Sequence, residues 1–243
     1  MAGFFYNLGR KVGPKVRKAQ WMWQSLAGSE ADAIAIERRV GLDLAHELTS
    51  QVDVDLDEGT RRFVRDIGDR LARHVANQKR RFDFEVLATG EPNAFALPGG
   101  FIYITRSLIE LCDRDGDEVA FVLAHEMGHV IRGHAINRIV TDSAIATASR
   151  VMPVRGALGA WLKKVGVEFL VSAYSQDLET EADALGSRLA EAAGCDTDAP
   201  LRLLSRLAAL REHPGEHDLS SYFATHPAPE VRMRNVRKAL RKP

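Results

Sequence analysis

One apolar helix constrains the fold of this chain more than any other segment. Residues from Asp117 to about Ala135 follow a helical pattern, and their apolar positions lie on nearly every side of that helix. A helix without a polar face has to be buried, so the rest of the chain is expected to pack around it. The run His125-Glu126-Met127-Gly128-His129 lies in its middle, and its polar side chains therefore require partners inside the protein.

The spacing within that run indicates a metal site. His125 and His129 are four residues apart, so their imidazoles lie on one helix face, where they can hold one cation. Glu126 leaves the helix beside the first of them and is placed to take a proton from water bound to zinc. Because a five-residue match also arises by chance on ordinary helices, the run needs support from elsewhere in the chain.

A second, acidic helix gives that support. A catalytic zinc takes a third protein ligand and keeps a fourth position open. Glu179 and Asp183 are four residues apart on a helix predicted over Leu178 to Ala193, so they share one face. We expect Glu179 to bind the metal and Asp183 to accept a ring N–H from a ligating histidine. Glu181 points to another side of this helix and is the less favoured ligand; a solvated acidic helix start is the alternative.

The remaining periodicity predicts an α+β fold. Helical spacing runs over 36–48 and 63–75, strand-like alternation over 82–86, and a tight reversal at Pro98-Gly99-Gly100 joins two short apolar segments. Everything that follows is helical. We predict a single, mainly helical domain with a small, mostly antiparallel sheet and an HExxH active-site helix.

Four segments of the chain follow one another in the order found in an enzyme family. They are residues 92–100 (Pro-Asn-Ala-Phe-Ala-Leu-Pro-Gly-Gly), the HEMGH run, the Glu179/Asp183 pair and Thr225-His226-Pro227. Together the chain resembles, over about residues 35–235, the HtpX/BepA-type zinc metallopeptidases, gluzincins related to the Ste-type CAAX prenyl proteases. The resemblance implies a metallopeptidase domain over 30–243 that binds one Zn2+ per chain.

The resemblance also implies roles for individual residues. Asn93, Ala94, Phe95 and Ala96 would form an edge strand that pairs with an extended polypeptide substrate. His226 would lie near the metal, where it covers the ion in a latent state or stabilises the oxyanion. Arg232 would steady that oxyanion. Without the resemblance, His226 and Arg232 look like loop and surface residues, and His134, His213 and His217 match no ligand position and are expected to be surface or structural.

These features favour a zinc-dependent metalloendopeptidase that acts on unfolded or membrane-associated proteins. One alternative is a zinc-bound, chaperone-like binding module with little proteolysis, but such a module has no need of Glu126 beside the metal. Another is a hydrolase that acts on something other than peptides. The expected edge strand disfavours it, because such a strand pairs with a polypeptide. The HEMGH run alone does not separate these activities.

The first 29 residues differ from the rest in charge. Residues 1–29 contain no Asp or Glu but five Lys or Arg among bulky aromatics, which is equally typical of a membrane-surface anchor and of an arm packed on a protein. No signal peptide or transmembrane helix is predicted, so we expect a cytoplasmic or peripheral membrane-associated protein. Lys plus Arg equals Asp plus Glu at 33 each, which disfavours nucleic acid as a partner. Cys112 and Cys195 could form one disulfide, but two buried thiols are the favoured expectation. The sequence predicts no particular oligomeric state.

Overall fold

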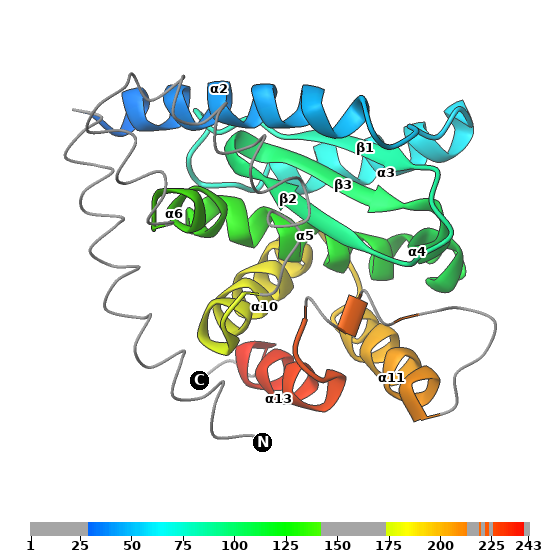
Figure 1. Ribbon diagram of the computed structural model, residues 1–243. Coiled ribbons are helices and arrows are strands. Elements are labelled where there is room, and N and C mark those ends of the chain that lie inside the picture. Colours follow the sequence, from blue (N-terminus) through cyan, green and yellow to red (C-terminus); the bar gives the residue numbers. More distant parts are fainter. Residues whose placement is uncertain (1–28, 142–173, 213–218, 220–221, 224–225, 241–243) are drawn as a thin grey trace.

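The computed structural model describes residues 29–141, 174–212, 219, 222–223 and 226–240. The basic-aromatic arm predicted over 1–29 lies outside these residues except for Ser29, and so do His213 and His217. The described part contains a small sheet with helices on both faces and a group of helices below it (Figure 1). This is the mainly helical α+β fold predicted from the periodicity, which is therefore confirmed.

The sheet is mixed. Strand β1 (Asp83–Leu87) pairs in parallel with β3 (Phe101–Thr105), and β2 (Ala94–Leu97) pairs with β3 in antiparallel fashion, in the order β1-β3-β2. The prediction of a mostly antiparallel sheet is thus wrong in one detail. The chain reverses direction twice between β1 and β3, first before β2 and again through the 3-10 turn η1 (Pro98–Gly100), and β3 then inserts between the other two strands.

Strand alternation divides the apolar side chains between two clusters. Helix α2 (Glu30–Thr49) covers one face of the sheet, where it packs on Phe101 and Tyr103. Helices α3 (Glu58–Ala72) and α5 (Gly116–Ile131) cover the other face, on the side of Ile102 and Ile104 (Figure 1). Because successive side chains of a strand point to opposite faces, β3 is buried on both.

Helix α5 is the buried helix expected at the centre of the fold. It follows the short helix α4 (Arg106–Leu111) and begins at Asp115, whose carboxylate accepts the N–H groups of Asp117 and Glu118. It ends at Ile131, four residues before the predicted end. Gly133 has a φ of +69°, a left-handed conformation that glycine adopts without strain, and the chain then starts α6 (His134–Thr141).

The C-terminal helices lie on the side of α5 that faces away from the sheet. They are α10 (Gln176–Ala192), α11 (Ala199–Glu212) and α13 (Pro229–Leu240) (Figure 1). Helix α10 approaches α5 closely because two glycines remove the intervening side chains. A Cβ built at Gly186 would lie 2.8 Å from the backbone nitrogen of His125, and one at Gly128 would lie 3.2 Å from Ala182. This contact brings the acidic helix against the two histidines.

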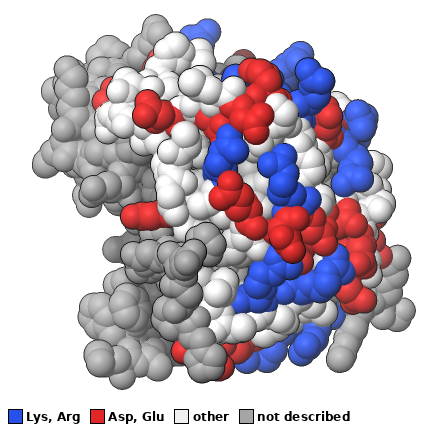
Figure 2. Space-filling view, turned by 90° about the vertical axis from the view of Figure 1, so that its right-hand side faces the viewer, with Lys and Arg blue, Asp and Glu red and all other residues white. Residues whose placement is uncertain are grey.

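The surface carries charges of both signs, and the two cysteines lie inside the protein. On the face drawn in Figure 2, basic and acidic side chains intermingle. Cys112 and Cys195 are free, buried thiols, as predicted. None of the helices in the described ranges has both the length and the apolar character that a membrane crossing requires.

Candidate metal centre

Four side chains from three parts of the chain converge in the described structure. His125 and His129 come from α5, Glu179 comes from the first turn of α10, and His226 comes from the segment before α13. The side chains of the first three are at most 2% exposed and that of His226 is 6% exposed. Glu181, by contrast, is 54% exposed and lies beside Arg132, away from this cluster.

The distances within the cluster fit a cation with tetrahedral coordination. The Nε2 atoms of His125 and His129 are 3.2 Å apart, and they lie 3.5 and 3.2 Å from the carboxylate oxygens of Glu179. Ligands bound to zinc at about 2.0–2.1 Å on a tetrahedron are about 3.3 Å apart. In addition, Oε1 of Glu179 is buried and, apart from the His129 ring 3.2 Å away, has no hydrogen-bond partner in the described part, which is an unusual state for a carboxylate. The residues therefore fit a bound metal ion.

His226 overlaps with this set of ligands. Its Nδ1 lies 3.0 Å from Oε2 of Glu179, and His125, Glu179 and His226 form a second group with the separations of a metal site. The sequence placed His226 near the metal only through the family resemblance, and the structure brings it to the same carboxylate. His125, His129 and Glu179 can thus supply three ligands to a metal ion, and His226 can occupy its fourth coordination position.

A buried ion pair orients His125. Oδ1 of Asp183 lies 3.0 Å from Nδ1 of His125, and Asp183 also accepts from Nε and Nη2 of Arg232 at 3.1 and 2.8 Å. If the proton of His125 is on Nδ1, as this carboxylate favours, then Nε2 has its lone pair directed to the cluster. Arg232 also donates to the Tyr222 hydroxyl and is only 3% exposed, so it is a core residue rather than a surface one.

The electrostatics of the cluster favour a positive charge between its carboxylates and imidazoles. Burial tends to raise the pKa of Glu179, but the adjacent His226, His125 and His129 hold it well below 4.5. Burial and Arg232 oppose protonation of His125, yet its hydrogen bonds to Asp183 and Glu179 raise its pKa to about 9. Burial lowers the pKa of His129 to about 4. The buried carboxylates thus stabilise a cation at this point, whether it is a proton or a metal ion.

Glu126 lies next to the cluster without joining it. The residue is 2% exposed, and its carboxyl group hydrogen-bonds to the backbone of Ala96 on β2. Burial raises the pKa of Glu126 to about 8. A carboxyl with a raised pKa beside a cation site has the chemical character of a general base or acid.

Strand β2 is an edge strand of the described sheet, and its outer side borders this carboxyl group. Asn93 and Thr105 face each other across the sheet, since the Thr105 N–H donates to the Asn93 carbonyl at 2.9 Å. The alternation of an antiparallel pair then turns the backbone of Phe95 towards β3 and that of Ala94 and Ala96 towards the free edge. The N–H of Ala94 donates to the Asn93 side chain, and the backbone of Ala96 is bonded to Glu126. Among the described residues this leaves two carbonyls for a second strand, on residues that are 3 and 4% exposed. Of the four predicted substrate-binding residues, Ala94 and Ala96 face the edge.

Sequence reasoning missed the surroundings of His129. His134, expected to be surface or structural, is 3% exposed, and its Nδ1 lies 3.0 Å from Nδ1 of His129. Tyr174 stacks on the His129 ring with centroids 4.1 Å apart, and Arg138 lies over the Tyr174 ring. The glycine directly before His134 was the available signal, because it ends α5 and lets the chain turn back.

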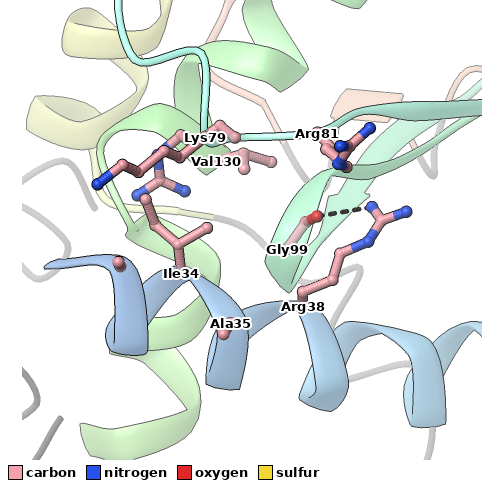
Figure 3. A pocket seen from close by; sticks show the side chains of 9 residues that line it. Ile34, Ala35, Arg38, Lys79, Arg81, Gly99 and Val130 are labelled. Carbon is pink, nitrogen blue, oxygen red and sulfur yellow. Dashed lines mark hydrogen bonds between the residues drawn. The ribbon is translucent and has the colours of Figure 1, made fainter. Parts of the chain in front are cut away.

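A separate hollow of about 220 Å³ lies between α2 and the loop that precedes β1 (Figure 3). Two of its basic side chains are engaged within the fold: Arg38 donates to the Gly99 carbonyl at 2.8 Å (Figure 3), and Arg80 pairs with the buried Glu37 at 3.0 Å. The hollow contains none of the residues of the metal cluster. We therefore regard these side chains as the attachment of α2 to the sheet.

Comparisons with known proteins agree with this geometry. The chain is 29% identical over 164 residues to the mitochondrial metalloendopeptidase OMA1 of Schizosaccharomyces pombe, which covers 66% of this chain and 47% of that protein. It is 26% identical over 223 residues to the beta-barrel assembly-enhancing protease of Escherichia coli K12, which covers 84% of this chain and 44% of that protein. The chain thus spans about half the length of these relatives.

A family model also matches most of the chain. The model of peptidase family M48 matches residues 60–240, which include every residue of the metal cluster, Glu126, β2, Asp183 and Arg232. The resemblance seen in the four sequence segments is thereby confirmed. The chain belongs to peptidase family M48, a family of metallopeptidases.

Proposed function

We propose that this chain is a zinc-dependent metalloendopeptidase that hydrolyses peptide bonds in unfolded or membrane-associated proteins. The observation that carries the proposal is the tetrahedral spacing of His125, His129 and Glu179 next to the buried carboxyl of Glu126. Two relatives whose names describe them as a metalloendopeptidase and a protease support it. Their names give no support to a chaperone-like module without proteolysis.

The ligand chemistry favours one zinc ion per chain. Two imidazoles and one carboxylate at tetrahedral spacing suit zinc, whereas magnesium and calcium prefer more oxygen ligands. When bound, zinc supplies a Lewis acid that polarises a carbonyl and lowers the pKa of water to about 7. Glu126 is then the general base that takes the proton. Asp183, which is hydrogen-bonded to Arg232, keeps the Nε2 of His125 directed to the ion.

The positions of Arg232 and His226 refine their proposed roles. Arg232 contacts the Nδ1 side of His125 and donates to Asp183, so we assign it to positioning rather than to direct contact with the oxyanion. His226 lies against Glu179 and can serve as a fourth ligand that covers the metal in a latent state. Substrate binding would then have to displace His226.

The free edge of β2 is the proposed binding place for the substrate. An extended segment that donates N–H groups to the carbonyls of Ala94 and Ala96 would add a strand beside Glu126. Backbone pairing has little sequence preference, which suits unfolded chains. The name of one relative connects that protein with β-barrel assembly, and an incompletely assembled β-protein exposes such strands. We further propose that residues 30–243 form the peptidase domain and that residues 1–29 contact a membrane surface.

A digest of an unfolded protein tests the proposed activity. Wild type loaded with zinc should cleave the substrate, a chelator should stop cleavage, and added zinc should restore it. Glu126→Gln should retain zinc and fold but lose about 10²- to 10⁴-fold in rate, because the amide cannot accept a proton. If Glu126→Gln cleaves at the rate of wild type, Glu126 is not the base. If zinc-loaded wild type leaves every polypeptide intact, the chain is not an endopeptidase.

A further inference from the structure

The two histidines of the proposed zinc site have different partners for their second ring nitrogen. His125 faces a carboxylate, with its Nδ1 3.0 Å from Asp183. His129 faces another imidazole, with its Nδ1 3.0 Å from Nδ1 of His134. A carboxylate, a carbonyl or water is the usual partner of a ligating histidine, so the histidine partner needs a physical account.

The short contact determines where the protons lie. Two Nδ1 atoms at 3.0 Å can share only one proton, because two protons would repel and two lone pairs would leave buried acceptors unpaired. One shared proton at this contact is the arrangement that two neutral imidazole rings supply. If His129 directs the lone pair of Nε2 to the cation, its proton is on Nδ1. His134 then accepts this proton's hydrogen bond at Nδ1 and carries its own proton on Nε2.

We propose that His134 is a positioning residue that accepts the Nδ1–H of His129 and thereby holds the Nε2 of His129 towards the zinc site. This inference rests on the proposed zinc site. It assigns to His134 the function that Asp183 has for His125.

The fold holds the His129 ring from two directions. The left-handed conformation of Gly133 ends α5 and turns α6 so that its first residue, His134, meets the edge of the ring at an interplanar angle of 70°. Tyr174 covers one face of the same ring, at 19° from parallel. Stacking on Tyr174 fixes the plane of the His129 ring but does not distinguish its two tautomers. The hydrogen bond to His134 therefore determines which ring nitrogen carries the proton.

A neutral partner also preserves the charge of the site. Asp183 and Arg232 cancel each other, so zinc with its proposed ligands, of which Glu179 is the one anion, has a net charge of +1. A carboxylate in place of His134 would lower the charge around the ion by one unit and weaken its Lewis acidity. Glu181 does not act as such a carboxylate. Its nearest oxygen is 3.8 Å from Nε2 of His134, and its side chain is 54% exposed, so solvent screens its charge.

Two variants of equal shape separate the hydrogen bond from packing. His134→Asn keeps an acceptor oxygen near the position of Nδ1, and His134→Leu has nearly the same size as Asn without an acceptor. Zinc affinity is measured on the full chain by competition with a chelator of known affinity. We expect His134→Leu to bind zinc about 10- to 100-fold more weakly than wild type and His134→Asn to stay within a few-fold. Equal affinities of the two variants, whether high or low, would overturn the proposal.

Nitrogen NMR of the zinc-loaded wild type tests the same inference without a substitution. We expect His129 to carry its proton on Nδ1 and His134 to carry its proton on Nε2. A proton on Nδ1 of His134, or a cationic His134 ring, would contradict the assignment. Failure of this inference is distinguishable from failure of the proposed function: a wild type that binds no zinc refutes the metal site, whereas a zinc-binding wild type with indistinguishable variants refutes the role of His134 alone.

Discussion

Gly186 is the position where one added methyl group tests how the metal centre is built. It lies on α10, two turns after Glu179, and faces the backbone of α5. In Gly186→Ala, the new Cβ would be 2.8 Å from N and 2.9 Å from Cα of His125, and 3.0 Å from the backbone carbon of Ala124. Ordinary contacts begin at 3.4 Å, and backbone atoms at the centre of a buried helix cannot move aside. Helix α10 must therefore retreat from α5 by about 0.6 Å to restore a normal contact.

The expected magnitudes follow from this displacement. Replacing glycine by alanine inside a helix normally stabilises it by about 0.5–1 kcal/mol. Overpacking a tight interface costs about 1–3 kcal/mol, so we expect a net loss of about 1 kcal/mol in the free energy of unfolding. The distances from Glu179 to the two imidazoles, now 3.5 and 3.2 Å, should increase by a similar 0.6 Å. Metal sites tolerate deviations of about 0.2 Å, so zinc affinity should fall on the order of 10- to 100-fold.

Urea denaturation of the metal-free protein measures the stability, since bound zinc would add its own stabilisation. Chelator competition measures zinc affinity. Gly116→Ala is a matched control on α5, because its Cβ would meet only side-chain atoms at 3.9 Å. It should leave zinc affinity unchanged and alter stability by at most about 1 kcal/mol, in the stabilising direction. If Gly186→Ala is as stable as wild type and binds zinc equally well, the close approach of the two helices does not set the geometry of the site.

Three further predictions concern the cluster and its supports. Glu179→Ala should lose most of its zinc in metal analysis while Glu181→Ala retains it, because only the first carboxylate lies within the cluster; the opposite result would exchange their roles. His226→Ala should raise basal cleavage or speed the removal of zinc by a chelator, whereas lost activity with unchanged zinc removal would make His226 an oxyanion stabiliser. Asp183→Ala leaves the Arg232 guanidinium buried without its carboxylate, so chemical denaturation should show a loss of about 3–5 kcal/mol; a loss below about 1 kcal/mol would mean that the ion pair contributes little.

Local spacing along the chain accounts for much of the candidate site. A helix has 3.6 residues per turn wherever it lies, so the four-residue interval alone places His125 with His129 and Glu179 with Asp183. The near absence of polar positions around the histidines likewise predicted that α5 is central. The strand at 94–97 was predicted from the turn residues that follow it. All of these inferences depend on neighbours within a few positions of the chain.

Sequence patterns were less successful where one pattern is compatible with two different structures. The apolar periodicity continues past Ile131 into Ala135 and Ile136, so it predicted one helix where Gly133 divides two. Similarly, the pairing of β1 could not be predicted from its own alternation, which is the same in parallel and antiparallel sheets. Its direction depends on the insertion of β3 between the other strands.

The way in which the parts of the site meet depends on the packing of the whole chain. Glu179 reaches the imidazoles only because Gly128 and Gly186 let two distant helices touch. Arg232 looked like a surface residue, but its charge is stable in the core because Asp183, 49 positions earlier, neutralises it. His134 became the partner of His129 because the chain turns back at Gly133. A sequence shows which side chains share a face of one element, whereas the contacts between faces depend on packing, which is settled by all elements together.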